Sequence, residues 1–138
     1  MAMPKTPDAR DYYRAAYQRI DDAQSLLDND RTTAAVYLAG YAVECILKSL
    51  LLSCVPNREH GGIMELFRGR LAHDFGWLTM QYVRHSKSTI PREVHRALTR
   101  VRTWSTDMRY MTGTTPPDEA DSFVDAVKFI LHWAKGRL

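Results

Sequence analysis

A cluster of cationic side chains in the middle of the sequence is the first feature that suggests chemistry. Between positions 58 and 109 the chain has 10 Lys and Arg against 5 Asp and Glu, whereas the remaining residues have 9 against 11. Arg92, His95 and Arg96 share one face if the residues after Pro91 form a helix. Such a face attracts phosphate through charge, so we expect it to bind RNA or a nucleotide phosphate, or else to be only a solvated basic face.

Base recognition would also need exposed aromatic rings beside this charge. On the predicted helix after Pro91, Trp104 falls on the apolar side together with Val94, Leu98 and Val101. We therefore expect contacts with phosphate and no readout of bases.

Glu44 and Lys48 are two charged residues in an otherwise apolar stretch, and they stand four residues apart. This spacing, with Glu on the N-terminal side, favours an ion pair on one helix. Buried charges need partners, and Arg109 is a candidate second partner for Glu44. We interpret Glu44 and Lys48 as a structural ion pair rather than a ligand site. The two charges also argue against a membrane span over residues 34–55.

Motifs of the common cofactor and metal sites are missing from the sequence, which has no P-loop, no GxGxxG and no Cys/His constellation. Cys45 and Cys54 match neither a CxxC pair nor a zinc knuckle, so we expect buried free thiols. We predict no cofactor and no bound metal. The segment MAMPKTPDAR has no recognisable secretion signal, and we expect a cytoplasmic protein.

Helix-length apolar patterns must position these side chains. With 138 residues, of which 45% are hydrophobic and 25% charged, the chain fits one domain over residues 1–138. No alternating strand pattern occurs, so we predict an all-α, antiparallel up-and-down bundle of four to five helices. We expect a first helix from Thr6-Pro7 to Asp28 and a second from a cap at Asp30 to just before Pro56. An irregular helical region follows around Gly69. Two further helices begin near Pro91 and, with a capping-box-like spacing, at Thr115.

The second of these helices is apolar around nearly its whole circumference, which predicts that it is the central one. Its small residues would let another helix approach closely, from within the chain or from a second copy; they are Ala35, Ala39, Gly40 and Ala42. We therefore expect a homodimer.

Three stretches of sequence resemble motifs of the HEPN domain family. YLAGYAVECILKSLL at 37–51 resembles the second helix of that family, with a Glu and a Lys four residues apart. LAHDFGWL at 71–78 resembles its segment of a His with apolar residues, and WSTDMRY at 104–110 resembles its Trp and Arg-Tyr turn. The resemblance implies a HEPN-like helical bundle, often homodimeric, that binds nucleotides or RNA. We add Arg70, Arg109 and Tyr110 to the candidate RNA-binding residues.

Catalytic members of the family cleave RNA without a metal, and they carry an Arg followed four to six residues later by a His. Arg68 and His73 have this spacing. In such an enzyme His73 would be the acid and base toward the 2′-hydroxyl, and the planar fork of Arg68 would hold the phosphate. Residues five apart on a continuous helix diverge by about 140°, so the pair needs a break at Gly69 or a second subunit.

These features together predict a module that binds RNA or a nucleotide phosphate. The resemblance implies a toxin-antitoxin or defence system as its setting, with a nucleotidyltransferase-type antitoxin as the candidate partner. Two alternatives stay open. One is a metal-independent endoribonuclease that uses Arg68 and His73, and the other is a non-catalytic helical dimerisation module.

Overall fold

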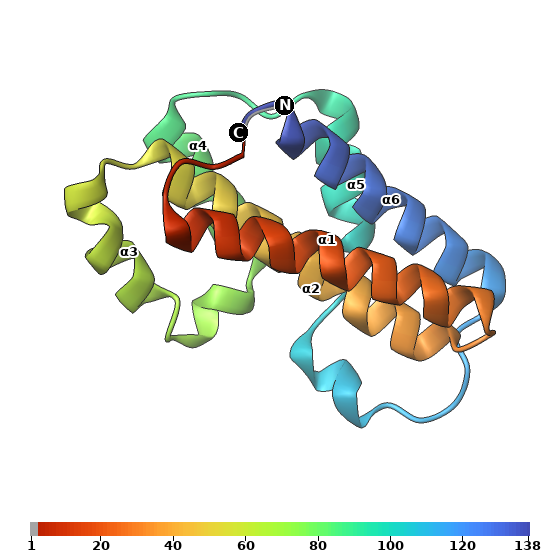
Figure 1. Ribbon diagram of the computed structural model, residues 1–138. Coiled ribbons are helices and arrows are strands. Elements are labelled where there is room, and N and C mark those ends of the chain that lie inside the picture. The colour runs from red at the N-terminus through yellow and green to blue at the C-terminus, as the bar shows by residue number, and fades with distance from the viewer. Residues whose placement is uncertain (1–2) are drawn as a thin grey trace.

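The computed structural model describes residues 3–138, and within this range the chain is helical and contains no strand (Figure 1). Its α-helices are α1 (Pro7–Asp28), α2 (Thr32–Cys54), α3 (His60–Leu66), α4 (Phe75–Ser86), α5 (Arg92–Val101) and α6 (Pro117–Lys135). Short 3-10 helices lie between them: η1 (Asn57–Glu59), η2 (Arg70–His73) and η3 (Thr106–Tyr110). The all-α prediction is confirmed. Met1 and Ala2, which begin the segment considered for a secretion signal, lie outside the described residues.

The irregular stretch of the prediction contains two α-helices. α3 ends at Leu66, η2 begins at Arg70, and α4 starts at Phe75, where the Asp74 carboxylate accepts a hydrogen bond from the Trp77 amide at 3.0 Å. The expected number of four to five helices therefore becomes six α-helices within residues 3–138.

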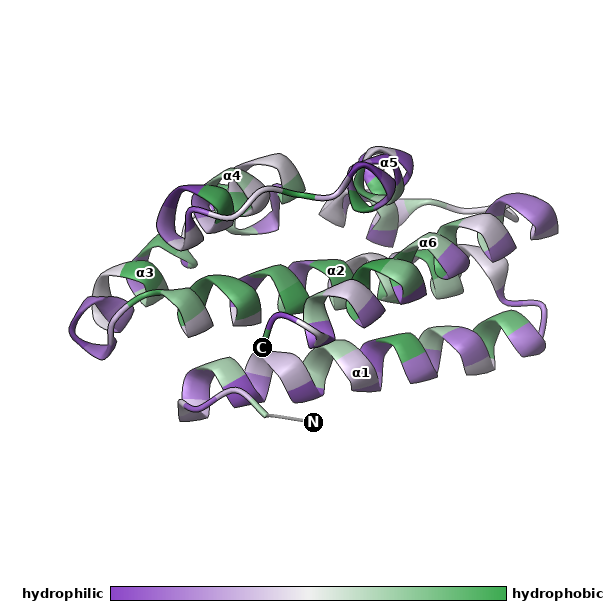
Figure 2. Cartoon of the chain, turned by 90° about the horizontal axis from the view of Figure 1, so that it is seen from above, coloured by the Kyte–Doolittle hydropathy of each residue, from purple (hydrophilic) through white to green (hydrophobic). Residues whose placement is uncertain are grey.

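The central position of α2 is confirmed. It packs against α1, α4 and α6, and Figure 2 shows it as the most apolar helix, between α1 on one side and α4 on the other. By length and composition α2 could cross a membrane, with a mean hydropathy of 1.6 over its most apolar window. However, 78% of that window is buried inside the chain, as in the core helix of a helical bundle.

α1 begins as the sequence predicts. The Thr6 hydroxyl accepts a hydrogen bond from the Ala9 amide at 3.4 Å, and Pro7 occupies the first turn. The buried residues Ala16 and Ile20 stand four apart and face the core. Because the Ser49 hydroxyl donates to the Ala9 carbonyl at 2.8 Å, α1 and α2 are also tied together at this end.

The predicted cap of α2 at Asp30 is wrong, because Asp30 ends α1 instead. Its backbone is left-handed, with φ of 60°. The Asp30 amide donates to the Leu27 carbonyl at 3.1 Å, and the Arg31 amide donates to the Leu26 carbonyl at 2.8 Å. This hydrogen-bond pattern satisfies the last carbonyls of a helix, so the turn closes α1 and leads directly into α2.

The predicted cap of α6 at Thr115 is also wrong. Pro116 precedes α6 and makes no side-chain cap. The polar groups of Thr115 instead bind the start of α2: its carbonyl accepts from the Thr32 hydroxyl at 2.7 Å, and its hydroxyl lies 3.0 Å from that of Thr33. The threonine therefore ties the loop before α6 to the central helix.

The small residues of α2 are covered by the chain itself. Ala35, Ala39 and Ala42 are fully buried, and a Cβ at Gly40 would overlap the Trp104 indole. Trp104 lies beyond the end of α5 and is 5% exposed, and its Nε1–H donates to the Tyr37 carbonyl at 3.0 Å. Trp104 fills the space at Gly40, and the three alanines are buried within the chain, so the small residues of α2 give no reason to expect a dimer.

This packing predicts that Gly40→Ala lowers the free energy of unfolding by about 2 kcal/mol, because the added methyl must displace a buried indole. Gly61→Ala is a matched control: Gly61 also lies in a helix, but a Cβ added there would have nothing within 4 Å. This control should gain about 0.5 kcal/mol from helix propensity. Urea unfolding measures both, and a Gly40→Ala protein as stable as wild type would contradict this packing.

Candidate functional site

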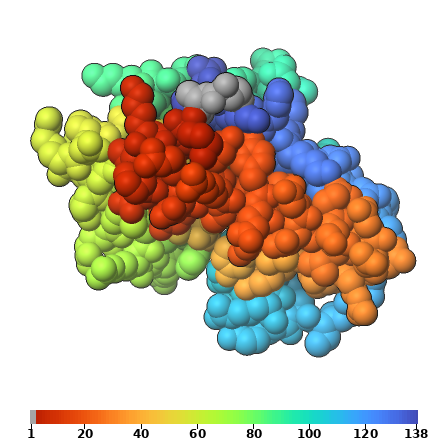
Figure 3. Space-filling view, in the orientation of Figure 1, coloured from red at the N-terminus to blue at the C-terminus, as the bar shows by residue number. Residues whose placement is uncertain are grey.

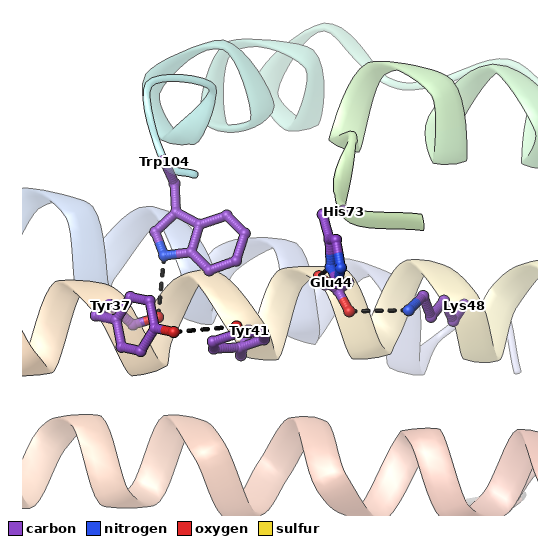
Figure 4. Close-up of polar contacts among 6 residues, drawn as sticks. All are labelled: Tyr37, Tyr41, Glu44, Lys48, His73 and Trp104. Carbon is purple, nitrogen blue, oxygen red and sulfur yellow. Dashed lines mark hydrogen bonds and ion pairs between the residues drawn. The ribbon is translucent and has the colours of Figure 1, made fainter. Parts of the chain in front are cut away.

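A buried ion pair at the middle of α2 anchors the candidate site. The Lys48 ammonium lies 2.8 Å from Glu44 Oε2, and both residues are only 5% exposed. The predicted structural pair is thus present in the structure. The second carboxylate oxygen, Oε1, lies 2.6 Å from His73 Nδ1 of η2, as Figure 4 shows. Because a carboxylate only accepts, Nδ1 must be the donor, and Nε2 is left available to a ligand.

Two aromatic rings complete the surroundings of Lys48. Its Nζ lies 5.5 Å from the ring centre of Tyr12 in α1 and 5.1 Å from that of Phe67, which follows α3. The rings meet edge to face with their centres 5.7 Å apart. Rings attract a cation through their electron-rich faces, so the ammonium has a carboxylate and two aromatic partners in place of water. Burial also raises the pKa of Tyr12, mainly through desolvation.

The predicted contact between Arg109 and Glu44 is wrong. Both carboxylate oxygens of Glu44 already have partners, and they come from α2 and η2. Arg109 is exposed on η3, where its guanidinium lies 4.9 Å from the ring centre of Tyr110. Tyr110 itself is 73% exposed. The Arg-Tyr turn is therefore a surface feature, separate from the buried pair.

Arg68 and His73 contact different carboxylates. Gly69 is extended and separates α3 from η2, so the break in the helix that the pair requires does exist. However, the Arg68 side chain is 80% exposed and lies 3.7 Å from the exposed carboxylate of Glu65. His73 points toward Glu44, with 44% of its side chain exposed. Within one chain, the structure gives the two residues no common polar partner.

His73 instead shares a hollow with two arginines. A cavity of about 400 Å³ lies between η2, the start of α4 and the segment before η3; its charged lining residues are Arg70, His73, Asp74 and Arg102. A smaller hollow of about 90 Å³ adjoins it and shares Phe75, Gly76 and Arg102. A third, of about 240 Å³ on α5, adjoins the second through His95 and Thr99.

These three hollows form one continuous surface, which we call the basic groove. Its ionisable lining residues are Arg70, His73, Asp74, Arg92, His95, Arg96 and Arg102. The single carboxylate among them, that of Asp74, is occupied in capping α4. The structure thus brings together the cations predicted on η2 and on α5, whereas Arg68, Arg109 and Tyr110 do not line the groove.

Arg102 was missed by the sequence reasoning. It lies just past the end of α5, seven residues after His95 and three after Thr99, so it continues the face of these residues. Extending the helical period past Val101 would have found it. Arg102 matters because it belongs to both of the neighbouring hollows at this end of the groove and so joins the α5 cations to His73.

The aromatic residues of the groove form its floor. Phe75 and Trp104 are 6% and 5% exposed, and their rings stack on each other at 5.3 Å with an angle of 8° between their planes. With so little of either ring exposed, neither offers a free face for a base.

Residues 3–138 contain no group of three or more His, Cys, Asp or Glu that could hold a metal ion. Cys45 and Cys54 are free and only partly buried. Burial raises the pKa of each thiol to about 11. A thiol with such a pKa is mostly protonated near neutral pH and is a poor nucleophile, so neither cysteine is a candidate catalytic residue.

The model of the HEPN domain matches residues 9–137, nearly the whole chain. The chain belongs to the HEPN domain family. This confirms the resemblance that the motifs at 37–51, 71–78 and 104–110 suggested. Comparisons with curated proteins and with solved structures gave no match.

The buried pair of this HEPN domain predicts the effect of removing its cation. Lys48→Met leaves the Glu44 carboxylate buried without its ammonium, so the free energy of unfolding should fall by about 3–5 kcal/mol. Adding Glu44→Gln to Lys48→Met should recover part of this loss, because no uncompensated charge remains.

Urea unfolding of both proteins checks this prediction, with Asp22→Asn as the control. Asp22 pairs with Arg19 at 3.6 Å on the surface, and removing that pair should cost less than about 1 kcal/mol. If Lys48→Met and Asp22→Asn lower the free energy of unfolding by the same amount, removing the cation of the buried pair is no more destabilising than breaking an exposed pair, which contradicts this prediction.

Proposed function

We propose that this HEPN domain binds the phosphate backbone of RNA in the basic groove. The observation that carries the proposal is the continuity of the groove, which gathers four arginines and two histidines from η2, α5 and the residue after α5. Several cations along one groove can contact successive phosphates of a backbone. A solvated basic face on α5 alone would not extend to η2.

The geometry favours contact with phosphate over recognition of bases. The guanidinium groups of Arg70 and Arg102 can each bind a phosphate through two parallel hydrogen bonds. Nε2 of His73 offers a different contact at the same place: because Nδ1 donates to Glu44, Nε2 of the neutral ring accepts, and it can bind a ribose 2′-hydroxyl. Since Phe75 and Trp104 form a buried floor, bases have no ring to stack on inside the groove. We therefore expect weak sequence preference.

The proposal predicts that RNA binding depends on the groove cations. Replacing both Arg96 and Arg102 by Gln should weaken the binding of a fluorescein-labelled, mixed-sequence single-stranded RNA by about tenfold or more at low salt. The plot of log K against log salt should also become shallower, by about 0.7 for each phosphate that the variant no longer binds. Fluorescence anisotropy over a range of salt concentrations measures both quantities.

The control for this experiment removes the same charge elsewhere. Arg14 in α1 and Arg58 in η1 are exposed and do not line the groove. The Arg14→Gln, Arg58→Gln protein should keep an affinity within about threefold of wild type, because only long-range attraction is reduced. Equal decreases in affinity for the two double variants would contradict a groove-specific site and would favour a merely solvated basic surface.

RNA cleavage without a metal is the second candidate function, and the hydrogen bond between Glu44 and His73 favours it. A buried carboxylate that fixes one ring nitrogen orients the other for proton transfer, as a general base requires. In this alternative Arg70 and Arg102, which line the same hollow as His73, are better placed for the phosphate than Arg68. RNA recovered uncut after incubation with the protein in EDTA would contradict cleavage while leaving binding intact.

The cellular setting is a prediction from the family resemblance alone. A toxin-antitoxin or defence role in the cytoplasm, with a nucleotidyltransferase-type antitoxin as partner, fits a small RNA-binding HEPN domain. Groove residues such as Arg96 would then be the part of the surface that an antitoxin must cover to block RNA.

A further inference from the structure

A second cavity, separate from the basic groove, opens between α5, the η3 segment and the start of α6. Its volume is about 640 Å³, which lies in the range of pockets that bind small organic molecules. In Figure 1 the segment that joins α5 to α6 swings out below α2, and in Figure 3 it forms a projection, light blue, on the lower side. We call the cavity the methionine pocket after Met108 and Met111 of this segment; its other apolar lining residues are Val36, Trp104 and Phe123.

The apolar part of the methionine pocket combines a fixed floor with an adaptable wall. Val36, Trp104 and Phe123 belong to the buried core. Met108 is partly buried against that core, whereas Met111 is 58% exposed. Methionine side chains adapt their shape to an inserted group and make favourable contacts with aromatic rings. This part of the pocket therefore suits one aromatic or other large apolar group.

The rim of the methionine pocket carries unlike charges that do not pair with one another. Arg100 lies in the last turn of α5, and Asp118 and Glu119 lie in the first turn of α6. All three are exposed, and none of them forms an ion pair with any of residues 3–138. One apolar cavity thus has a guanidinium on one wall and two carboxylates on another. A ligand that carries both a negative and a positive group can use both walls.

A ligand with a single charge would leave part of this rim unmatched. An organic cation could pair with the carboxylates but would meet the like charge of Arg100, and an organic anion would meet the reverse conflict. A zwitterionic head avoids both. Its carboxylate can accept two parallel hydrogen bonds from the guanidinium, and its ammonium can donate to the carboxylates of α6. An α-amino acid carries these two groups on one carbon, next to its side chain.

We propose that the methionine pocket binds a free α-amino acid with a large apolar side chain. The side chain of the ligand lies between the methionines and the floor of Trp104 and Phe123. Its α-carboxylate pairs with Arg100, and its α-ammonium pairs with Asp118 and Glu119. This site goes beyond the proposed binding of RNA, because its lining contains none of the cations of the basic groove.

A matched set of indole compounds separates the contributions of the two charges. L-Tryptophan carries both groups, tryptamine lacks the carboxylate, and indole-3-propionate lacks the ammonium. NMR of ¹³C-labelled methionine methyl groups follows each titration, because a bound indole ring shifts nearby methyl signals. L-Tryptophan should move the Met108 and Met111 signals with a Kd below about 1 mM. The other two compounds should bind about tenfold more weakly, since each loses one charged hydrogen-bonding group.

Met80 is the internal control for this experiment. It is as exposed as Met111, at 57%, but lies on α4 outside the methionine pocket. Its methyl signal should therefore stay in place throughout the titration.

Substitutions at the rim test which residue holds which group. Arg100→Gln should weaken the binding of L-tryptophan by about tenfold without weakening that of tryptamine. Asp118→Asn with Glu119→Gln should weaken the binding of L-tryptophan without weakening that of indole-3-propionate. Arg14→Gln and Asp125→Asn remove exposed charges outside the pocket and should change each affinity by less than about twofold. All substituted positions are exposed, so circular dichroism should confirm that each variant folds.

Four results would overturn the proposal. Met108 and Met111 signals that do not move at several millimolar L-tryptophan would show that the pocket does not bind it, and an equal movement of Met80 would show non-specific contact. Tryptamine or indole-3-propionate that binds as tightly as L-tryptophan would show that the zwitterionic head is not recognised. Equal losses of affinity in Arg100→Gln and Arg14→Gln would exclude the assigned pairing.

The amino-acid site and the RNA site can be tested separately. The protein with Arg96→Gln and Arg102→Gln should keep its affinity for L-tryptophan, because neither residue lines the methionine pocket. Loss of RNA binding in that protein with unchanged binding of L-tryptophan is the expected result. Loss of both would contradict two separate sites.

Discussion

The burial of the Glu44–Lys48 pair in the central helix is the constraint on which the rest of the structure depends. A helix in this position must be apolar, yet two charges lie at its middle, 5% exposed. The carboxylate has two oxygens, and Lys48 satisfies only one of them. The other requires a donor from outside α2, and His73 supplies it, so the chain after α3 must return to the middle of α2.

A second constraint acts one turn earlier on the same helix. Gly40 and Glu44 are four residues apart and therefore lie on one face of α2. The missing side chain at Gly40 admits the Trp104 indole. Glu44 holds His73, and Figure 4 shows the side chains of Trp104 and His73 along the same helix. Because Trp104 follows α5 and His73 ends η2, the two contacts bring these segments together. The basic groove is the surface between them, so its position is set from within the core.

Local patterns allowed much of the fold to be predicted from the sequence. Three such features are confirmed: the Thr6-Pro7 start of α1, the apolar face of α5 and the central position of α2. Each depends on residues close in sequence. The Glu44–Lys48 pair is equally local.

The cap predicted at Asp30 failed for a local reason, its left-handed backbone, but three other misses come from contacts between residues distant in sequence. Thr115 binds α2 because it lies beside Thr32 and Thr33 in space, more than eighty residues away. Nothing near Gly40 in the sequence indicates Trp104, and His73 was considered for catalysis without its carboxylate partner. The most direct measurement is ¹⁵N NMR of the His73 ring during titration with single-stranded RNA. We expect a proton on Nδ1, held by Glu44, and a change in the Nε2 resonance as RNA fills the groove; a proton on Nε2 with a bare Nδ1, or no change with saturating RNA, would contradict the proposed site.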